Sequence, residues 1–480
     1  MNLPVRRAAA ALTALLAFAL AACGSELDPN TVAQVNGTGG SVGSAAAGVD
    51  APQAAGSAPA GGPAAARGDT PSGGSGQTST AGGGAGGDLD GQGDNSATGG
   101  GKAAGCQGFK NQTGITDDKI VIANVSDISG PVPGLFQSSQ DAVRAYVAYF
   151  NQNADICGRK LEVLNLDSRT DAGAGQQAYT QACDQAFAAV GSMSGFDSGG
   201  ASEAEKCGLP DLRATSVLPE RQQCTTCFGA QSVDSTTYQN AVPDHILKKY
   251  PDAAKAAAMV YLNAGAAPPN AANQVKADER RGMDFVYVQG IDVSEFNYAP
   301  YVQQMKDKGV KYVQFIGPYQ NSVKLAQAMQ QQGFKPDVFA LDPTGYSPDY
   351  VQTGGAAVDG TRVFINIALF NDPNKEVQLY QAWLQQVRPG AEPSYFGAYS
   401  WSAARLFVET ALKLGGKLSR QSMVQEISRV DDWTGNGLHA PQHVGAKKTS
   451  ECWRWIRLDG SAWVPDGPVD YTCNGVTSGA

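Results

Sequence analysis

Histidine is scarce in this chain, and the residue pattern of a common class of hydrolase is absent. The 480 residues contain three histidines, at positions 245, 439 and 443. A hydrolase needs a nucleophile within reach of a base. The one turn that could present a nucleophile, Gly191-Ser192-Met193-Ser194-Gly195, has methionine at the centre, where the G-x-S-x-G pattern requires serine. These two absences argue against hydrolytic chemistry.

Other absences exclude further classes of protein. After the first 25 residues no apolar stretch is long enough to span a membrane. The formal net charge is −9, and no basic patch with interleaved aromatic residues occurs, so we expect no nucleic-acid partner. The glycine-rich run that ends at Lys102 lacks the GK[ST] of a phosphate loop. His439 and His443 flank Pro441, which spoils a helical pair of zinc ligands. We therefore expect neither a metal nor a cofactor.

The chain begins with features of an export signal. Arg6 and Arg7 precede a short apolar run that ends in small residues, which predicts a signal peptide over residues 1–22. The sequence at its end, Leu20-Ala21-Ala22-Cys23-Gly24, resembles a bacterial lipoprotein box, and a chance cysteine in an alanine-rich leader is the alternative. The resemblance implies cleavage before Cys23, lipidation of that cysteine, and anchoring to the outer face of the bacterial cell membrane.

A tether follows the predicted anchor. From Ser25 to about Gly105 the chain contains no aromatic residue and almost no large aliphatic one, so it cannot bury enough surface to offset its conformational entropy. A flexible chain of roughly eighty such residues has a reach of about 50 Å. We expect residues 23–105 to hold a folded domain away from the membrane.

The folded part, residues 106–480, carries an even number of cysteines, as is typical of exported domains with disulfides. The candidates are Cys106, Cys157, Cys183, Cys207, Cys224, Cys227, Cys452 and Cys473. Cys224-Thr-Thr-Cys227 lies in polar, proline-flanked sequence, which favours a structural staple over a redox motif. Cys452 and Cys473 flank the last apolar element and are candidates to staple it, while other pairings stay open.

Strand patterns alternate with helix patterns along the domain. DKIVIANVSDISG reads as a buried strand and loop, SSQDAVRAYVAYFNQ as a helix, and FAAVGSM as another strand. This alternation predicts an α/β fold with parallel sheets covered by helices on both faces, and such sheets bind ligands beyond the carboxyl ends of their strands. VGSMSGFDSGG follows such a strand. Its small residues could admit a ligand, with Ser194 and Ser198 as donors and Asp197 as acceptor, or could form an ordinary surface turn.

From KIVIANVSDISGPVPGLFQSSQDAVRAYVAYFN through ICGRKLEVLNLDSRTD, the chain resembles the branched-chain amino-acid family of ABC-transporter solute-binding proteins. The resemblance implies the two-lobe type I periplasmic-binding fold, in which the chain crosses three times between lobes. It places lobe one at about 106–241 and 371–451, and lobe two at about 242–370 and 452–480. The crossings then lie near Val242, Phe370 and Cys452.

The resemblance also implies a binding site. Ser129-Gly130-Pro131 and Phe136 match the family's first loop, residues 194–198 match the loop that receives a carboxylate in amino-acid binders, and Asp342 matches an acid that holds the ammonium group. Asp197 replaces an expected hydroxyl, so we expect a small polar solute, such as an amino acid, an amide or a related small molecule, other than a branched-chain amino acid. Inter-lobe packing or helix capping are the alternatives for these positions. The predicted ligand-binding residues are Ser129, Phe136, Ser194, Gly195, Phe196, Asp197, Ser216, Tyr319 and Asp342.

The sequence thus predicts a lipid-anchored protein, without catalytic residues, that closes two lobes on a small solute and delivers it to the membrane permease of an ABC importer. A sensor that passes the closed state to a receptor partner is the main alternative. An exported hydrolase and an adhesive wall protein are further alternatives from other classes.

Overall fold

A computed structural model describes residues 105–480 of the chain. The predicted signal peptide, Cys23 and the predicted tether up to residue 104 lie outside the described residues. Within residues 105–480, no helix has the length and apolar character needed to cross a membrane.

The first half of the described chain builds a sheet of five parallel strands in the order β2-β1-β3-β4-β5. The strands are β1 (Lys119–Ser126), β2 (Lys160–Asp167), β3 (Ala188–Val190), β4 (Asp211–Thr215) and β5 (Cys227–Gln231). Strands β3 and β4 and the edge strand β5 are buried throughout, as expected for a parallel sheet with both faces covered. We call this sheet and its helices lobe one.

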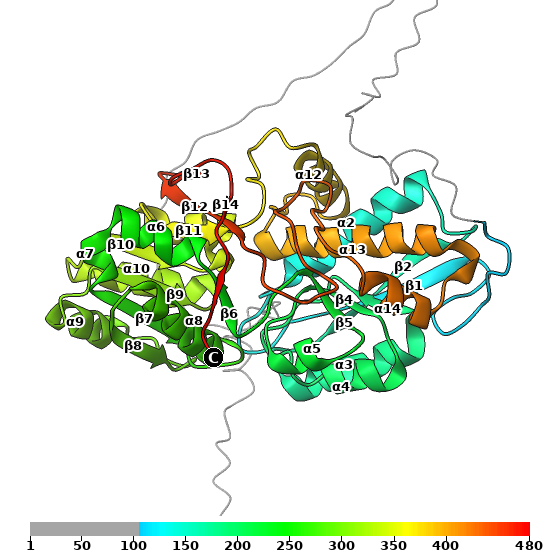
Figure 1. Cartoon of the computed structure of the whole chain (residues 1–480), viewed down its shortest axis with the longest axis horizontal. Coiled ribbons are helices and arrows are strands. Elements are labelled where there is room, and N and C mark those ends of the chain that lie inside the picture. Colours follow the sequence, from blue (N-terminus) through cyan, green and yellow to red (C-terminus); the bar gives the residue numbers. More distant parts are fainter. Residues whose placement is uncertain (1–104) are drawn as a thin grey trace, which may run out of the picture. The chain divides into compact units, whose positions relative to one another are not determined.

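Helices cover both faces of the lobe-one sheet. One face packs through Ile122, Val190 and Leu212, and the other through Ala123, Val125 and Ala189. Helix α13 is buried along almost its whole length and packs beside α2 (Figure 1). The helices of this lobe are α2 (Gln137–Asn153), α3 (Ala172–Gln185), α4 (Ala201–Cys207), α5 (Pro219–Gln223), α12 (Lys375–Val387), α13 (Tyr395–Leu414) and α14 (Arg420–Ile427), with the 3₁₀ turn η3 (Gly415–Lys417).

A second, mixed sheet forms lobe two. Its order is β13-β12-β11-β10-β9-β7-β8, with β14 paired to β12. The pairs from β11 to β8 are parallel, whereas β12 pairs antiparallel with β11, β13 and β14. The strands are β7 (Ala257–Leu262), β8 (Phe285–Ile291), β9 (Tyr312–Ile316), β10 (Val338–Leu341), β11 (Arg362–Ile365), β12 (Cys452–Asp459), β13 (Ala462–Pro465) and β14 (Thr472–Cys473).

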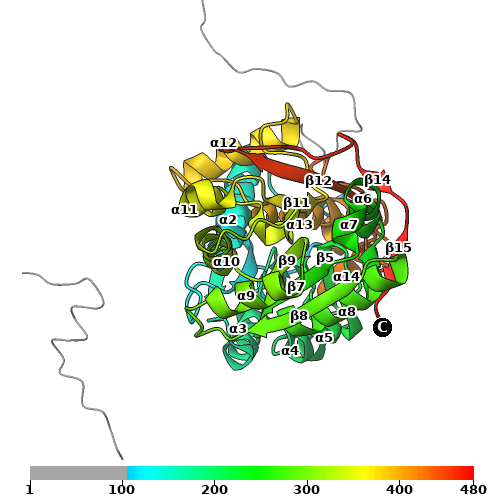
Figure 2. The same cartoon turned by 90° about the vertical axis from the view of Figure 1, so that its left-hand side faces the viewer.

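Lobe two is also covered by helices, several of which are visible around its sheet in Figure 2. Proline opens α8 and α9, where its missing N–H costs no intrahelical hydrogen bond. The helices are α6 (Ala241–Lys249), α7 (Pro251–Ala254), α8 (Ala267–Arg281), α9 (Ala299–Asp307), α10 (Tyr319–Gln331) and α11 (Pro348–Gly354), with 3₁₀ turns η1 (Pro343–Gly345) and η2 (Gly355–Val358).

The chain passes between the two sheets three times: from β5 to α6, from β11 to α12, and from α14 to β12. A small two-stranded sheet accompanies the first passage, in which β6 (Thr237–Gln239) pairs with β15 (Val476–Ser478) near the end of the chain. Asn366, at the second passage, accepts hydrogen bonds from the hydroxyls of Tyr395 and Tyr399 at 2.6 and 2.8 Å. The predicted α/β architecture is thus confirmed.

All eight candidate cysteines form disulfides. The pairs are Cys106–Cys157, Cys183–Cys207, Cys224–Cys227 and Cys452–Cys473. The last pair joins β12 to β14, at directly opposite positions of an antiparallel ladder. The Cys224–Cys227 pair leads directly into β5, so the stretch around it belongs to the edge of the lobe-one sheet.

Candidate ligand-binding site

A cavity of about 430 Å³ lies where the carboxyl ends of strands from both sheets face each other. Lobe one lines it with Thr215 at the end of β4 and Gln231 at the end of β5, and lobe two with Leu262 and Ile316 at the ends of β7 and β9. We call it the cleft cavity. Its position fits the rule that α/β sheets bind ligands beyond the carboxyl ends of their strands.

The cleft cavity is lined mainly by apolar side chains. Those from lobe one and its loops are Val132, Leu135, Phe136, Met193, Phe196, Val217 and Phe396, and those from lobe two and the connecting segments are Val233, Leu262, Val293, Ile316, Phe364 and Trp453. Among the described residues, Asp342 is the only charged side chain in the lining, and no lysine, arginine or histidine contributes to it. The sequence predicted a small polar solute, and this lining is more apolar than a site for such a solute is expected to be.

The loop that follows β3, residues 191–200, carries four of the predicted site residues, and we call it the lip. Asp127, buried after β1, accepts hydrogen bonds from the hydroxyl of Ser194 and the N–H of Gly195, both at 2.9 Å. The N–H of Phe196 donates to the Ser194 oxygen at 3.0 Å. Burial raises the pKa of Asp127, although hydrogen bonds from Ser168, Gly195 and Ser194 oppose the shift. Gly195 and Phe196 line the cleft cavity, whereas the Ser194 hydroxyl is occupied by Asp127.

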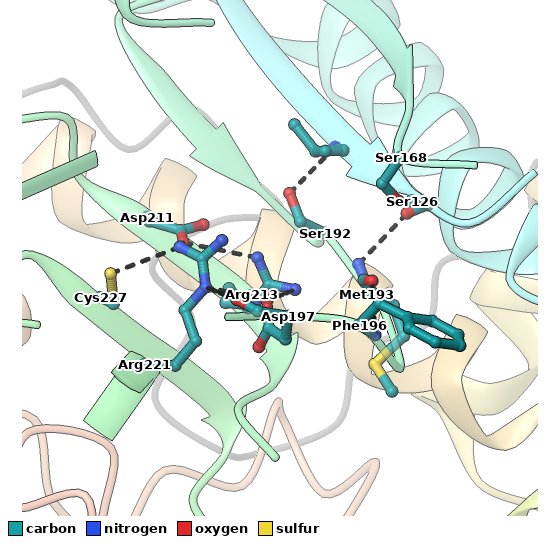
Figure 3. A network of polar contacts seen from close by, with 12 residues as sticks. Ser126, Ser168, Ser192, Met193, Phe196, Asp197, Asp211, Arg213, Arg221 and Cys227 are labelled. Carbon is teal, nitrogen blue, oxygen red and sulfur yellow. Dashed lines mark hydrogen bonds and ion pairs between the residues drawn. The ribbon is translucent and has the colours of Figure 1, made fainter. Parts of the chain in front are cut away.

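Asp197 of the lip belongs to a buried group of ion pairs (Figure 3). Its Oδ1 lies 2.7 Å from Nη2 of Arg213 and 2.8 Å from Nε of Arg221. Nη1 of Arg221 also pairs with Oδ2 of Asp211 at 2.6 Å, and the Tyr179 hydroxyl donates to the same carboxylate. Two positive and two negative groups therefore compensate each other. The ligand role predicted for Asp197 stays a prediction, since its side chain is not part of the cavity lining.

This buried group fixes the lip to the sheet. Arg221 also donates from Nε to the backbone carbonyl of Asp197, at 3.1 Å, and its Nη1 lies 3.6 Å from Sγ of Cys227. The side chain thus connects the lip to Cys227 (Figure 3), which forms a disulfide with Cys224. The lip is held by Asp127 on one side and by Arg221 on the other.

Two predicted residues of the first loop lie in different surroundings. Ser129 is exposed and donates from its hydroxyl to Oδ2 of Asp167 at 2.5 Å. It is absent from the cavity lining. Phe136 lines the cleft cavity and packs edge-on against Phe396, with the ring centroids 5.3 Å apart. Phe136 is therefore placed to contact a ligand, and Ser129 is placed to fix the end of β2.

After β4, the predicted residue and its neighbour face different spaces. Thr215 lines the cleft cavity, whereas Ser216 lines a separate small pocket between lobe-one elements. Both hydroxyls are buried without a hydrogen-bond partner in the described part of the chain. A buried hydroxyl without a partner is unfavourable, so the Thr215 hydroxyl is a candidate for ligand contact.

Lobe two contributes Tyr319 and Asp342. Tyr319, at the start of α10, lines a larger groove of about 820 Å³. Six prolines line that groove, which we call the proline groove: Pro133, Pro318, Pro343, Pro348, Pro389 and Pro393. Asp342 follows β10 and lines the cleft cavity. Its Oδ1 accepts hydrogen bonds from the N–H and the hydroxyl of Thr344, and burial raises the pKa of Asp342 to about 6.

The structure brings together residues that sequence reasoning missed. Gln239, Asn270 and Trp453 line the cleft cavity from segments that are far apart in the sequence. Trp453 comes from β12, which the sequence marked only as the last apolar element. Asp127, which holds the lip, was read only as part of a loop, and no local signal marks its partner residues.

The three histidines lie elsewhere. His439 is buried beside the hydroxyl of Ser402, at 2.8 Å, and burial lowers the pKa of His439 to about 4. His443 pairs with Asp431 on another surface, and His245 lies on α6. No histidine of the described chain lines the cleft cavity. The Ser402–His439 pair is closed off from solvent, so it offers no access for a substrate.

Comparison with solved structures supports the two-sheet architecture. The chain is similar to the LivJ substrate-binding protein of a branched-chain amino acid transporter from Streptococcus pneumoniae, solved with isoleucine, at 14% identity and a TM-score of 0.62, over 74% of this chain and 99% of that one. It is also similar to a fatty acid ABC transporter substrate-binding protein from Thermomonospora curvata, at 17% identity and a TM-score of 0.63, over 76% and 95% of the two chains.

A third similar structure is an ABC-transporter solute-binding protein from R. palustris in complex with 4-hydroxybenzoate, at 15% identity and a TM-score of 0.60, over 75% of this chain and 97% of that one. At these identities the likeness concerns the fold. No curated protein matches the chain. The family model described as periplasmic binding protein matches residues 119–461. That match confirms the family resemblance seen in the sequence, and the chain belongs to the periplasmic binding protein family.

Proposed function

We propose that this protein is the extracytoplasmic, lipid-anchored solute-binding component of an ABC importer. It takes a small solute into the cleft cavity, closes its two lobes on it, and presents the closed form to a membrane permease. The observation that supports this most directly is the cleft cavity itself, which is lined by strand ends of both lobes. A ligand that contacts both lobes stabilises their closed arrangement by its differential affinity for that arrangement.

The solved relatives support transport in general terms but differ in ligand. Their names give isoleucine, a fatty acid and 4-hydroxybenzoate as ligands or transported compounds. The scaffold is thus associated with several chemistries, and the ligand of this chain has to be argued from its own cavity. Binding without chemical conversion suits this site, because the cavity lining of the described chain offers one carboxyl and no histidine, cysteine or lysine.

A ligand screen tests the binding function. Purified residues 105–480 should show a rise in melting temperature with at least one compound from a panel of amino acids, amides, amines, alcohols and aromatic acids, because a ligand that binds only the folded state stabilises it. Mass spectrometry of the same mixtures should recover the compound unchanged. A converted compound would instead support the hydrolase alternative.

The anchor is tested separately. If Cys23 is lipidated, the full-length protein should fractionate with membranes, and the Cys23→Ser variant should appear in the soluble fraction with the same melting temperature. Equal membrane retention of the variant would contradict the lipoprotein assignment. Crosslinking in membranes should recover a permease subunit with the ligand-bound protein, and recovery of a receptor in its place would favour the sensor alternative.

A further inference from the structure

The hydrogen-bond donors at Ser194, Gly195 and Phe196 of the lip are all occupied by groups of the chain itself. In the amino-acid binders that the sequence resembles, this loop receives the ligand's carboxylate. In this chain, acceptors of the chain itself take the place of such a ligand. The Ser194 hydroxyl and the Gly195 N–H both donate to Asp127, and the Phe196 N–H donates to the Ser194 oxygen. Asp127 is itself an acid, so the lip is backed by a carboxyl group where an anionic ligand would need positive charge.

The start of α8 is also depleted of donors. The first N–H groups of a helix normally favour a bound anion, and Ala266 and Ala267 at the start of α8 line the cleft cavity. The Ala266 N–H donates to the Gly195 carbonyl at 3.0 Å, and the Ala267 N–H to the Ala264 carbonyl at 3.3 Å. The next two residues, Pro268 and Pro269, have no N–H. No donor of this first turn is left for an anion.

The charged side chains of the cavity also disfavour an anionic ligand. Asp342 is the only charged side chain among the described lining residues, and it lies on the opposite lobe from Asp127. Its Oδ1 is held by Thr344, while its Oδ2 has no hydrogen-bond partner in residues 105–480. The described lining holds one carboxyl group and no cation, and the two arginines behind the lip are paired with Asp197 and Asp211, so a buried carboxylate on the ligand would meet no free positive charge.

Neutral polar groups remain available for a ligand. The Thr215 hydroxyl is buried in the cavity wall without a partner, and the Gln239 side chain lines the same cavity. Such groups, placed in an apolar lining, fix the orientation of an uncharged ligand through a few hydrogen bonds. Together with the free oxygen of Asp342, they suit a ligand with an apolar body and at least one hydrogen-bond donor.

We propose that the cleft cavity selects small molecules that carry no anionic group, with a largely apolar body and a hydrogen-bond donor directed to Asp342. The class comprises amines, primary amides and alcohols with aliphatic or aromatic bodies, and excludes carboxylates of the same shape. This inference rests on the proposed solute-binding function and narrows it. It differs from the amino-acid, fatty-acid and 4-hydroxybenzoate ligands named for the solved relatives, each of which carries a carboxyl group.

Matched probes test the inference by calorimetric titration of the wild-type protein. One series is benzylamine, benzyl alcohol and benzamide against benzoate. The other is leucinol, isoamylamine and 3-methylbutanamide against leucine and 3-methylbutanoate. We expect at least one probe without a carboxylate to bind, with an affinity at least about tenfold above that of its carboxylate partner, since an uncompensated buried charge is strongly unfavourable.

The outcomes separate this inference from the function on which it rests. If the carboxylates bind as tightly as their partners or tighter, the inference is wrong and the solute-binding function stands. If no probe of either kind binds, both the inference and the assigned cavity are overturned.

Variants of Asp342 distinguish a ligand that donates from a charged amine from one that donates from a neutral alcohol or amide. Burial raises the pKa of Asp342 to about 6, so an amine should bind more tightly as the pH rises through 6, and Asp342→Asn should abolish that gain with a loss of about tenfold or more. An alcohol or amide should show a flat pH profile and a smaller loss. Asp337→Asn, at the exposed opposite end of β10, is the matched control and should bind like the wild type. An unchanged affinity of every bound probe for Asp342→Asn would overturn the role of Asp342.

A second variant tests independently whether Asp127, behind the lip, disfavours anionic ligands. Asp127→Asn removes the acid and keeps one oxygen, which can accept from Ser194 in the place of Oδ1, while the amide NH₂ replaces the Oδ2 that accepts from Gly195. This variant should raise the affinity of the carboxylate probes several-fold relative to the matched probes without a carboxylate. If the order of the probe affinities stays as in the wild type, Asp127 does not exclude anions. If the variant does not fold, as its melting curve would show, the probe ranking of the wild type and the Asp342→Asn titrations decide the question.

Discussion

The backbone N–H of Ala266 donates to the carbonyl oxygen of Gly195 at 3.0 Å, and this hydrogen bond joins the start of α8 in lobe two to the lip of lobe one. Gly265, one residue earlier, has φ +56° and lies so close that an added Cβ would stand 2.5 Å from the same carbonyl oxygen. The absence of a side chain at Gly265 therefore permits the close approach of the two lobes beside the cleft cavity, which Gly265 also lines.

Gly265→Ala should hold the lobes apart. We expect the variant to bind its ligand about tenfold more weakly, corresponding to roughly 1.4 kcal/mol, and to show a larger radius of gyration in small-angle scattering. Gly333→Ala is the matched control, because Gly333 has a similar φ of +60° in the same lobe and an added Cβ there meets nothing within 4 Å. Equal affinities of the two variants would show that the Ala266–Gly195 contact does not contribute to closure.

Two glycines of the lip should respond differently to an added methyl group. At Gly195 the new Cβ would meet only Oδ2 of Asp127, at 4.0 Å, so Gly195→Ala should change the free energy of unfolding by less than about 0.5 kcal/mol. At Gly199 the Cβ would lie 1.8 Å from the carbonyl oxygen of Ala172. Gly199→Ala should cost about 1–3 kcal/mol, as overpacking does.

Binding measurements on the first of these variants then test the site. Because Gly195 lines the cleft cavity, Gly195→Ala should weaken ligand binding while its denaturant midpoint stays close to that of the wild type. A variant that binds normally would place the ligand away from the lip. A variant that unfolds would show that the lip tolerates no side chain and is structural.

The buried ion pairs of the lip predict a large effect on stability. Arg221→Met leaves Asp197 and Asp211 with one arginine between them, in a site without solvent access. Removing one partner of a buried ionic group typically costs about 3–5 kcal/mol, whereas an exposed pair contributes about 0–1 kcal/mol. Arg281→Met, which removes a surface pair with Asp244, is the control. Urea unfolding of both variants measures the difference, and similar losses would show that the buried group contributes no more than a surface pair.

The strand and helix order could be predicted from the sequence because each element has its own local pattern. The short apolar run at Ala188–Val190 and the small residues after it correctly indicated a strand end at the lip. Helix α13 is the most completely buried helix of lobe one in the described chain. Periodicity reports which residues are buried, and burial is what fixes these elements.

The polar contacts of the site could not be predicted in the same way. Asp127 reaches Ser194 and Gly195, and each pair is separated by more than sixty residues. Arg213 and Asp211 alternate along β4 with apolar neighbours, which by itself suggests a half-exposed strand, yet both are buried because Asp197 and Arg221 come to them from other segments. Complementary charges that meet only in the folded state leave no periodic signal in the sequence.

The end of the chain illustrates the same limit. Val476 pairs with Gln239 across more than two hundred residues, and β14 returns to β12 through the Cys452–Cys473 disulfide. The cysteines indicated that this region could be stapled, but nothing in the polar sequence of β15 marked its partner. The apolar sequence near the end of the chain indicated one element there, and that element is β12.

A buried acid on α8 predicts how stability depends on pH. Asp278 lies in the interior with its Oδ1 unpartnered in the described chain, while its Oδ2 faces the amide of Gln274 at 3.4 Å. Burial raises the pKa of Asp278 from its ordinary 3.8 to about 8. The folded protein therefore holds a proton on this carboxyl at pH values at which the unfolded chain has released it. Between about pH 4 and 8, the free energy of unfolding should fall by roughly 1.4 kcal/mol per pH unit from this group alone.

Asp278→Asn removes the titrating group and keeps the shape of the side chain. The stabilising contribution of the protonated carboxyl is complete below pH 4 and is lost as the pH rises through about 8. We therefore expect the variant to gain stability relative to the wild type as the pH rises through this window, with the largest advantage at pH 9. Glu279→Gln, at the exposed neighbouring position, should follow the wild-type curve. Urea unfolding at pH 5, 7 and 9 measures all three proteins, and parallel curves for wild type and Asp278→Asn would show that Asp278 ionises normally in the folded state.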